Sequence, residues 1–356
     1  LAGQLVSGIV MFEIMLGVPK MAALIITSVV LLIYVVLGGA HADILTDGVQ
    51  GFIMVGVGVL VAVLFCLGYG IEGGFDGMIS ALGSQDENLV GWLNVTDVLY
   101  HSWWAIFAVF LAHVPLGMLP HIGNKLWALK EPTQRMQFIR LAFVFALILA
   151  MLGFGGIMAR VILGEGIDSN QALALLFIDL FPSWFAALLG VGILAAVMST
   201  ADGLVVSSSQ IVANDLYRLS FVPRYRKDLS EEEVERRSLN ISRISTVVIM
   251  ILCTLLAWQT LDMNVTILVW IGVGCMMAAF AGPLILGSVW SGVTKAGAFA
   301  GLLTGGGVYI ITYLGVINPE WFAPGSLKDI ALWLQRESPN PYSCAAMGEI
   351  ASIAVT

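Results

Sequence analysis

Long uninterrupted apolar runs constrain this sequence more than any other feature. A helix that crosses a bilayer needs about 20 consecutive apolar residues. Runs of adequate length cover residues 21–38, 49–69, 138–161, 184–212, 244–261, 266–290 and 296–314, and an interrupted run covers 103–120. Residues 1–16 and the stretch from 342 onward read as partial spans. The sequence therefore predicts an all-α polytopic membrane protein with eight complete spans, and a chain truncated at both ends.

Composition excludes several classes of protein. Hydrophobic residues make up 59% of the chain and charged residues 11%, against about 45–50% and about 25% in soluble domains. A soluble enzyme and a disordered chain are excluded, and the net charge of −8 argues against nucleic acid as a partner. No nucleotide, hydrolase or zinc motif occurs. We therefore expect a partner in the lipid bilayer, no enzymatic activity and no cofactor.

The basic residues predict the orientation in the membrane. Lys and Arg number four in and beside loop 122–137, seven in 213–243, one in 291–296 and none in 40–48. The opposite side holds four, while its loop 70–102 has five acidic residues and no basic one. Since cytoplasmic loops are enriched in Lys and Arg, these four loops are predicted to be cytoplasmic. The chain is expected in the plasma (inner) membrane.

The cytoplasmic loop 213–243 contains the signature of a helix start. Ser230 followed by Glu233 is a capping box. We expect a short helix that begins there and closes at Arg236 and Arg237. It would serve as a solvated connector or as a docking site for a partner.

The interrupted span 103–120 carries polar and helix-breaking residues at membrane depth. From His113 to Gly123 the sequence reads H-V-P-L-G-M-L-P-H-I-G. Pro115 and Pro120 each remove a backbone donor, so the helix should unwind there. Because freed backbone groups are tolerated only beside protein or water, the break indicates a cavity or a kinked structural helix.

Two adjacent hydroxyls lie in the span 184–212. Ser199 and Thr200 share a helix face with Ala196, and Asp202 is the only ionisable group of this span. One interpretation is an oxygen site for a small cation. The other is close packing through a stripe of small residues, with the hydroxyls bonded to carbonyls one turn back.

A third polar stretch covers residues 37–50. Asp47 or Thr46 could cap the helix that begins near residue 49. Alternatively, Asp47 could lie on a cation pathway.

Three motifs carry a resemblance to a known family. They are Tyr34, Gly38, Gly39, Thr46, Asp47 and Gln50; the Pro-His-Ile segment at 120–122; and the segment 195–217, which begins A-A-V-M-S-T-A-D. Together they resemble the sodium/solute symporter family, which includes sodium-coupled glucose, proline, pantothenate and monocarboxylate carriers. The resemblance extends along essentially the whole chain.

The resemblance implies a five-plus-five inverted-repeat fold, the LeuT-like core, with extra C-terminal helices. Residues 1–69 would then be the end of the first repeat, with core helices three to five. Residues 70–102 would form an extracellular loop. The second repeat, core helices six to ten, would occupy 103–290, and the extra helices 291–356, the last one truncated.

The resemblance also implies site residues. The Ala196 carbonyl and the Ser199 and Thr200 hydroxyls would bind Na⁺ as the coupling ion. Some members hold a second sodium near the aspartate that matches Asp47. Because Asp202 stands here at a usual hydroxyl position of that site, the pair Asp47 and Asp202 would hold a cation or a proton. The solute would lie near residues of the broken span: His113, Leu116, Met118, Pro120 and His121.

The function implied is sodium-coupled symport of a small organic solute by alternating access. A monocarboxylate, a pantothenate-like compound or an amino acid would fit. Proline is not expected, since members that carry it have aromatic residues at the positions we align with Ala112 and Leu116. A sensor domain built on the same fold, a proton-coupled carrier using Asp202 and a channel are the alternatives.

Overall fold

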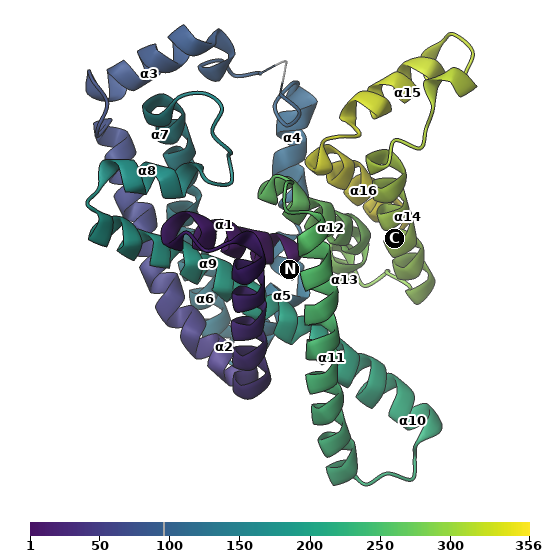
Figure 1. Ribbon diagram of the computed structural model, residues 1–356. Coiled ribbons are helices and arrows are strands. Elements are labelled where there is room, and N and C mark those ends of the chain that lie inside the picture. The colour runs from purple at the N-terminus through teal and green to yellow at the C-terminus, as the bar shows by residue number, and fades with distance from the viewer. Residues whose placement is uncertain (95–96) are drawn as a thin grey trace. The chain divides into compact units, whose positions relative to one another are not determined.

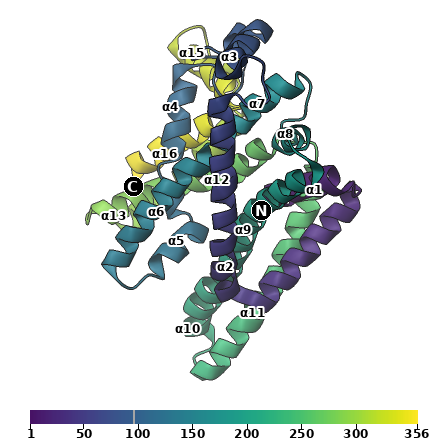
Figure 2. The same ribbon diagram turned by 90° about the vertical axis from the view of Figure 1, so that its left-hand side faces the viewer.

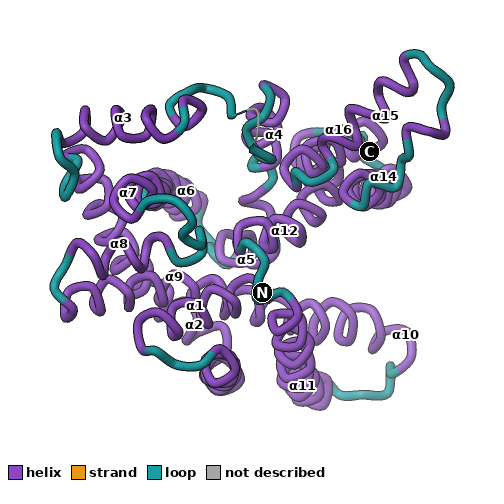
Figure 3. The backbone as a smooth tube through the Cα atoms, turned by 45° about the horizontal axis from the view of Figure 1, so that its top comes forward, coloured by secondary structure: helices purple, strands orange, loops and turns teal. Residues whose placement is uncertain are grey.

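The computed structural model describes residues 1–94 and 97–356, except for the side chains of residues 34, 37–43, 124 and 127. This part of the chain consists of helices joined by turns and loops, without a strand (Figure 3). In it, six helical segments are long and apolar enough to cross a membrane: Ile44–Leu67, Pro132–Leu163, Ser183–Tyr225, Glu231–Gln259, Val265–Val289 and Lys295–Tyr313. Shorter apolar helices cover Ala2–Leu16, Lys20–Ile33 and Trp103–Met118. The prediction of an all-α polytopic membrane protein is confirmed.

The chain forms two compact units. One contains Leu1–Leu82 and Asn124–Val265, and the other contains Gly83–Gly123 and Thr266–Thr356. These units do not follow the predicted repeats, because a repeat is defined by helix order along the chain and a unit by contacts in space. The boundaries 1–69, 70–102, 103–290 and 291–356 therefore stay a prediction.

The first unit is built around two long helices, α2 (Lys20–Leu67) and α9 (Ser183–Gln210), with α1 (Ala2–Leu16) and α11 (Glu231–Gln259) packed on both (Figure 1). The remaining helices of this unit are α3 (Gly74–Gln85, most of it), the end of α5 (Pro120–Trp127, from residue 124 onward), α6 (Pro132–Ala150), α7 (Gly153–Leu163), α8 (Ala172–Leu180), the π-helix Ile211–Phe221 and α10 (Val222–Tyr225). α3 and the 3₁₀ turn Glu87–Leu89 lie in the stretch predicted as an outer loop.

The predicted loop 40–48 is helical, because α2 continues from Lys20 to Leu67. Figure 2 shows that α2 changes direction part-way along its length. Its two apolar stretches, Lys20–Ile33 and Ile44–Leu67, overlap the predicted spans 21–38 and 49–69. Three residues of the first family motif, Tyr34, Gly38 and Gly39, have side chains outside the described residues.

Two other predicted loops are also largely helical. α5 (Pro120–Trp127) and α6 occupy most of 122–137, and the π-helix and α10 fill the start of 213–243. The capping box is confirmed: Ser230 accepts from the Glu233 amide at 3.3 Å, and Glu233 accepts from the Ser230 amide at 3.4 Å. The expected closure at Arg236 and Arg237 is wrong, since α11 continues to Gln259. Hydropathy marks where apolar residues end, whereas backbone hydrogen bonds continue through polar ones.

The second unit packs three helices through small residues. Its helices are α4 (Trp103–Ala112), the start of α5, α12 (Val265–Ala281, less its first residue), the π-helix Gly282–Leu286, α13 (Gly287–Val289), α14 (Lys295–Tyr313), α15 (Ser326–Glu337) and α16 (Pro341–Val355), with 3₁₀ turns at Leu116–Met118 and Pro319–Trp321. A Cβ atom on Gly305 of α14 would collide with the Ala278 carbonyl oxygen of α12. One on Gly348 of α16 would lie 2.6 Å from the Ala278 Cβ and 2.7 Å from the Gly305 oxygen. The three backbones therefore approach closely, as is typical of membrane helices.

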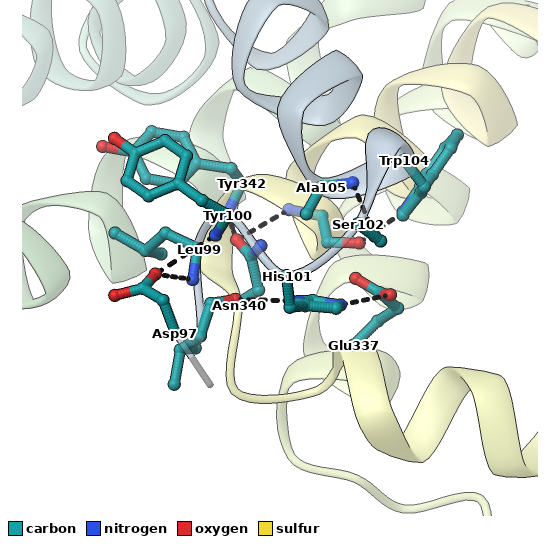
Figure 4. A network of polar contacts seen from close by, with 12 residues as sticks. Asp97, Leu99, Tyr100, His101, Ser102, Trp104, Ala105, Glu337, Asn340 and Tyr342 are labelled. Atoms are coloured by element: carbon teal, nitrogen blue, oxygen red, sulfur yellow. Dashed lines mark hydrogen bonds and ion pairs between the residues drawn. The ribbon is translucent and has the colours of Figure 1, made fainter. Parts of the chain in front are cut away.

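A buried polar network lies where α4 begins and α15 ends (Figure 4). His101 Nε2 is 2.9 Å from Glu337 Oε1, and both side chains are buried. His101 Nδ1 is 3.0 Å from the Val98 carbonyl oxygen. His101 Nε2 and Glu337 Oε1 therefore share a proton in a buried hydrogen bond, whichever of the two carries it.

The same network starts two helices. Ser102 Oγ accepts from the Ala105 amide at 3.1 Å and begins α4. Asn340 Oδ1 accepts from the amides of Tyr342 and Ser343 at 3.0 and 3.2 Å and begins α16. Burial raises the pKa of the Tyr100 phenol nearby, and the charge of Asp97 adds to the rise, so Tyr100 stays neutral.

The Gly305 contact gives a first prediction. Gly305→Ala forces α14 away from the Ala278 carbonyl and should destabilise the protein by about 1–3 kcal/mol. Gly307→Ala, two residues along the same helix, meets nothing within 4 Å and should be neutral or slightly stabilising. Thermal unfolding in detergent compares the two, and equal midpoints would contradict this packing.

The buried contact between His101 and Glu337 gives a second prediction. Glu337→Ala leaves the buried His101 Nε2 without its hydrogen-bond partner and should cost about 1–3 kcal/mol. Glu337→Gln keeps a hydrogen-bond acceptor and should cost less. Glu320→Ala is the control, because Glu320 pairs with Lys328 at 3.5 Å on the surface and such pairs contribute little. Thermal unfolding measures all three, and a similar effect of Glu337→Ala and Glu320→Ala would disprove the pair's importance.

Candidate functional site

The predicted sodium-site residues lie in the middle of α9. Thr200 Oγ1 donates to the Ala196 carbonyl oxygen at 3.2 Å, the back-bond that the packing interpretation anticipates. Ser199 instead donates to Asp47 Oδ1 of α2 at 2.7 Å. The structure thus brings Ala196 and Thr200 together and connects Ser199 to Asp47.

Close packing of α9 on α2 makes the Ser199 contact possible. A Cβ atom on Gly192 would lie 2.7 Å from Val57 Cγ2 of α2. Moving forward along α9 from Gly192 to Ser199 means moving backward along α2 from Val57 to Asp47, so the two helices are antiparallel. The stripe of small residues therefore packs against α2, and the hydroxyl of Ser199 belongs to the same contact.

Asp47 accepts from two other elements of the first unit. Oδ1 accepts from Ser199, and Oδ2 forms an ion pair with Lys125 from the last turn of α5. The alternative in which Asp47 or Thr46 caps a helix is wrong, because both residues lie inside the continuous α2.

Sequence reasoning missed Lys125 as a site residue and used it only to orient the chain. The signal was present: Asp47 and Lys125 are opposite charges at the ends of predicted spans on the same predicted side of the membrane. Such charges are expected to pair. The sequence does not show which basic residue pairs with Asp47, whereas the structure shows that it is Lys125.

Asp202 is fully buried on α9, three residues beyond Ser199. Its Oδ1 accepts from the Gly203 amide at 2.9 Å. Among the described residues, no group of three or more His, Cys, Asp or Glu side chains is placed to hold a metal ion. The oxygen atoms of this region belong to the Ala196 carbonyl, the Ser199 and Thr200 hydroxyls and the carboxylates of Asp47 and Asp202, and hard cations prefer oxygen ligands.

The predicted break in the span 103–120 is confirmed. α4 ends at Ala112, a 3₁₀ turn follows, and α5 begins at Pro120. All five predicted solute residues lie in or directly beside this break. His113 is exposed, and Leu116 packs against a buried cluster of the second unit. Met118, Pro120 and His121 are half-buried.

Two aromatic residues that the sequence did not indicate lie beside His113. The His113 ring centroid is 4.6 Å from that of Trp270 on α12 and 5.9 Å, in a stacked arrangement, from that of Tyr342 on α16. The ring centroids of Trp270 and Tyr342 are 4.2 Å apart. The three rings come from segments far apart in the chain, so no local spacing could have revealed them.

Curated relatives of the chain are transporters rather than enzymes. It is 26% identical over 320 residues to a sodium/pantothenate symporter of Haemophilus influenzae, which covers 88% of this chain and 63% of that protein. It is 28% identical over 320 residues to the high-affinity proline transporter PutP of Bacillus subtilis, with 86% and 62% covered. The chain thus spans less than two thirds of the length of these relatives.

A solved structure shows the same fold. The structure is that of a Na⁺-coupled sialic acid symporter in a substrate-bound outward-open state, and it matches 99% of this chain and 70% of its own chain, with a TM-score of 0.63 and 17% identity. The LeuT-like architecture expected from the sequence is confirmed by this match. The model of the sodium:solute symporter family matches residues 1–305, and the chain therefore belongs to that family.

Proposed function

We propose that this chain forms the greater part of a sodium-coupled symporter that moves a small organic solute by alternating access. The observation that carries the proposal is the hydroxyl pair of Ser199 and Thr200 in the middle of an apolar helix, with Ser199 bonded to Asp47. Hydroxyls at membrane depth are costly unless they are satisfied. Satisfying one of them with a carboxylate from another helix argues for a site rather than for packing alone.

The sodium ion would be held by the Ala196 carbonyl and the two hydroxyls. A hydroxyl has one donor and two acceptor lone pairs. Thr200 donates to Ala196 and Ser199 donates to Asp47, so the lone pairs of both oxygens remain available to a cation. Asp47 and Asp202 would form a second site for a cation or a proton, and at Asp47 the Lys125 ammonium already supplies a positive charge.

The solute would bind at the break between α4 and α5. Unwound backbone at membrane depth is tolerated where it lines a cavity, and His113, Leu116, Met118, Pro120 and His121 lie there. A monocarboxylate, a pantothenate-like compound or an amino acid fits this family. The rings of Trp270 and Tyr342 would add an apolar wall beside His113.

Coupling would supply enough free energy for accumulation. A 100 mV potential contributes about 2.3 kcal/mol per charge, and a tenfold sodium gradient contributes about 1.4 kcal/mol. Their sum, about 3.7 kcal/mol, would concentrate a neutral solute roughly 500-fold. Sodium and solute share this free energy because each stabilises the same outward-facing conformation.

We also propose the sidedness that the basic residues predict. The protein is an integral multi-pass membrane protein, and we place it in the plasma (inner) membrane. Segments 40–48, 122–137, 213–243 and 291–296 would face the cytoplasm, since they carry most of the Lys and Arg residues.

Removing the hydroxyl pair tests the sodium site. In proteoliposomes containing the full-length protein, Ser199→Ala with Thr200→Ala should lower sodium-driven uptake at least tenfold, because two of the proposed ligands are lost. Ser208→Ala is the matched control: it is on the same helix and bonds its own turn, to the Leu204 carbonyl at 2.7 Å. A panel of labelled monocarboxylates, pantothenate, amino acids and sugars identifies the solute. Uptake that needs no sodium, or survives the double substitution, would disprove the proposal.

A substitution in the break tests the solute site separately. His113→Ala should raise the KM for solute several-fold and leave the sodium concentration for half-maximal uptake nearly unchanged at saturating solute. Phe110→Ala, on an exposed position of α4, is the control. An unchanged KM would remove His113 from the site.

A further inference from the structure

The Asp47 carboxylate is shared between a hydroxyl and an ammonium group. Ser199 donates to Oδ1, and Lys125 pairs with Oδ2. From this arrangement we propose that the Lys125 ammonium takes the place of a second coupling cation at Asp47, so that the carrier binds one sodium ion per transport cycle. The inference rests on the proposed function and specifies its stoichiometry.

The Asp47 carboxylate already has a positively charged partner. Each carboxylate oxygen already has a donor, and the two donors come from different helices, α9 and α5. The side chains of Lys125 and Asp47 are 29% and 18% exposed, so water screens the pair only partly. A sodium ion on this carboxylate would lie within a few ångströms of the ammonium, and the two like charges would repel each other.

A tethered ammonium does what a bound sodium ion would do at this carboxylate. It neutralises a carboxylate that lies between helices, and it connects α2 to α5. A lysine does so at every sodium concentration, because it is part of the chain. The Asp47 charge would then contribute nothing to the sodium dependence of transport.

Lys125 also fixes the neighbouring hydroxyl. With Oδ2 held by Lys125, Oδ1 accepts the hydrogen bond from the Ser199 hydroxyl. Because that hydroxyl donates its hydrogen to Asp47, its lone pairs stay available to the proposed ion. Lys125 is therefore a positioning residue for that ion as well as the occupant of the second site.

The test counts sodium ions bound to the purified full-length protein, with ²²Na⁺ alone as the probe. We expect one ion per wild-type chain. Lys125→Gln removes the ammonium and keeps a side chain of similar length, so it should bind two ions, and the Hill coefficient of sodium-dependent uptake should rise from about 1 toward 2. Adding Asp47→Asn to Lys125→Gln should restore one ion. Lys125→Arg, which keeps the charge, and Lys130→Gln, on an exposed position in the loop after α5, should both bind one.

The outcomes separate this inference from the proposed function. A wild-type chain that binds two ions overturns the inference without any variant. The inference can therefore be disproved even if the Lys125→Gln protein fails to fold. One ion in both the wild type and Lys125→Gln overturns it too, while the sodium site on α9 stands. No bound sodium in the folded wild-type protein overturns the proposed function itself.

Discussion

The close contact between α2 and α9 holds the polar residues of the proposed sodium site together. Two helices can approach so closely only where one of them has a residue with a small side chain. Gly192 of α9 is such a residue, and it lies opposite Val57 of α2. The approach brings Ser199 within 2.7 Å of Asp47, which converts a hydroxyl on an apolar helix into part of a polar site. Without the close approach, Asp47 and Ser199 could not meet.

The two compact units carry different parts of the proposed activity. The first holds the oxygen atoms of α9 with Asp47 and Lys125. The second holds the broken span, its rings Trp270 and Tyr342, and the network of His101 and Glu337 that starts α4 and α16 nearby. In the second unit, Ser102 caps the start of α4 beside the buried contact of His101 with Glu337, and the glycine contacts hold α12, α14 and α16 close together. Each unit thus combines a tightly packed frame with polar groups that the frame keeps in place.

Much of the fold could be predicted from the sequence, because membrane helices are marked by run length alone. The break after Ala112 was also predictable, since Pro115 and Pro120 cannot continue a helix. Helix ends were not: α2 and α11 continue through polar residues where hydropathy suggested loops. Hydropathy shows which part of a helix lies in the apolar part of the membrane. It does not show where the helix ends, because the backbone hydrogen bonds can continue into polar residues.

The site was only partly predictable for the same physical reason. Ser199, Thr200 and Asp47 could be chosen because polar groups at membrane depth are rare. Their partners, such as Lys125 for Asp47 and the rings around His113, come from helices many residues away in the sequence. The spacing of residues along the chain therefore cannot predict these contacts. Asp47 as a helix cap was a reasonable interpretation of a local pattern that the continuous α2 contradicts.

Sodium-coupled symport can be tested by measuring the sodium flux and the solute flux at the same time. Full-length protein in proteoliposomes is given ²²Na⁺ and the labelled solute together, and the initial influx of each is recorded while the other is varied. In a coupled carrier, solute stimulates sodium influx, sodium stimulates solute influx, and we expect the two fluxes to keep one fixed ratio. Sodium influx that is indifferent to every transported solute would contradict sodium-coupled symport by this protein.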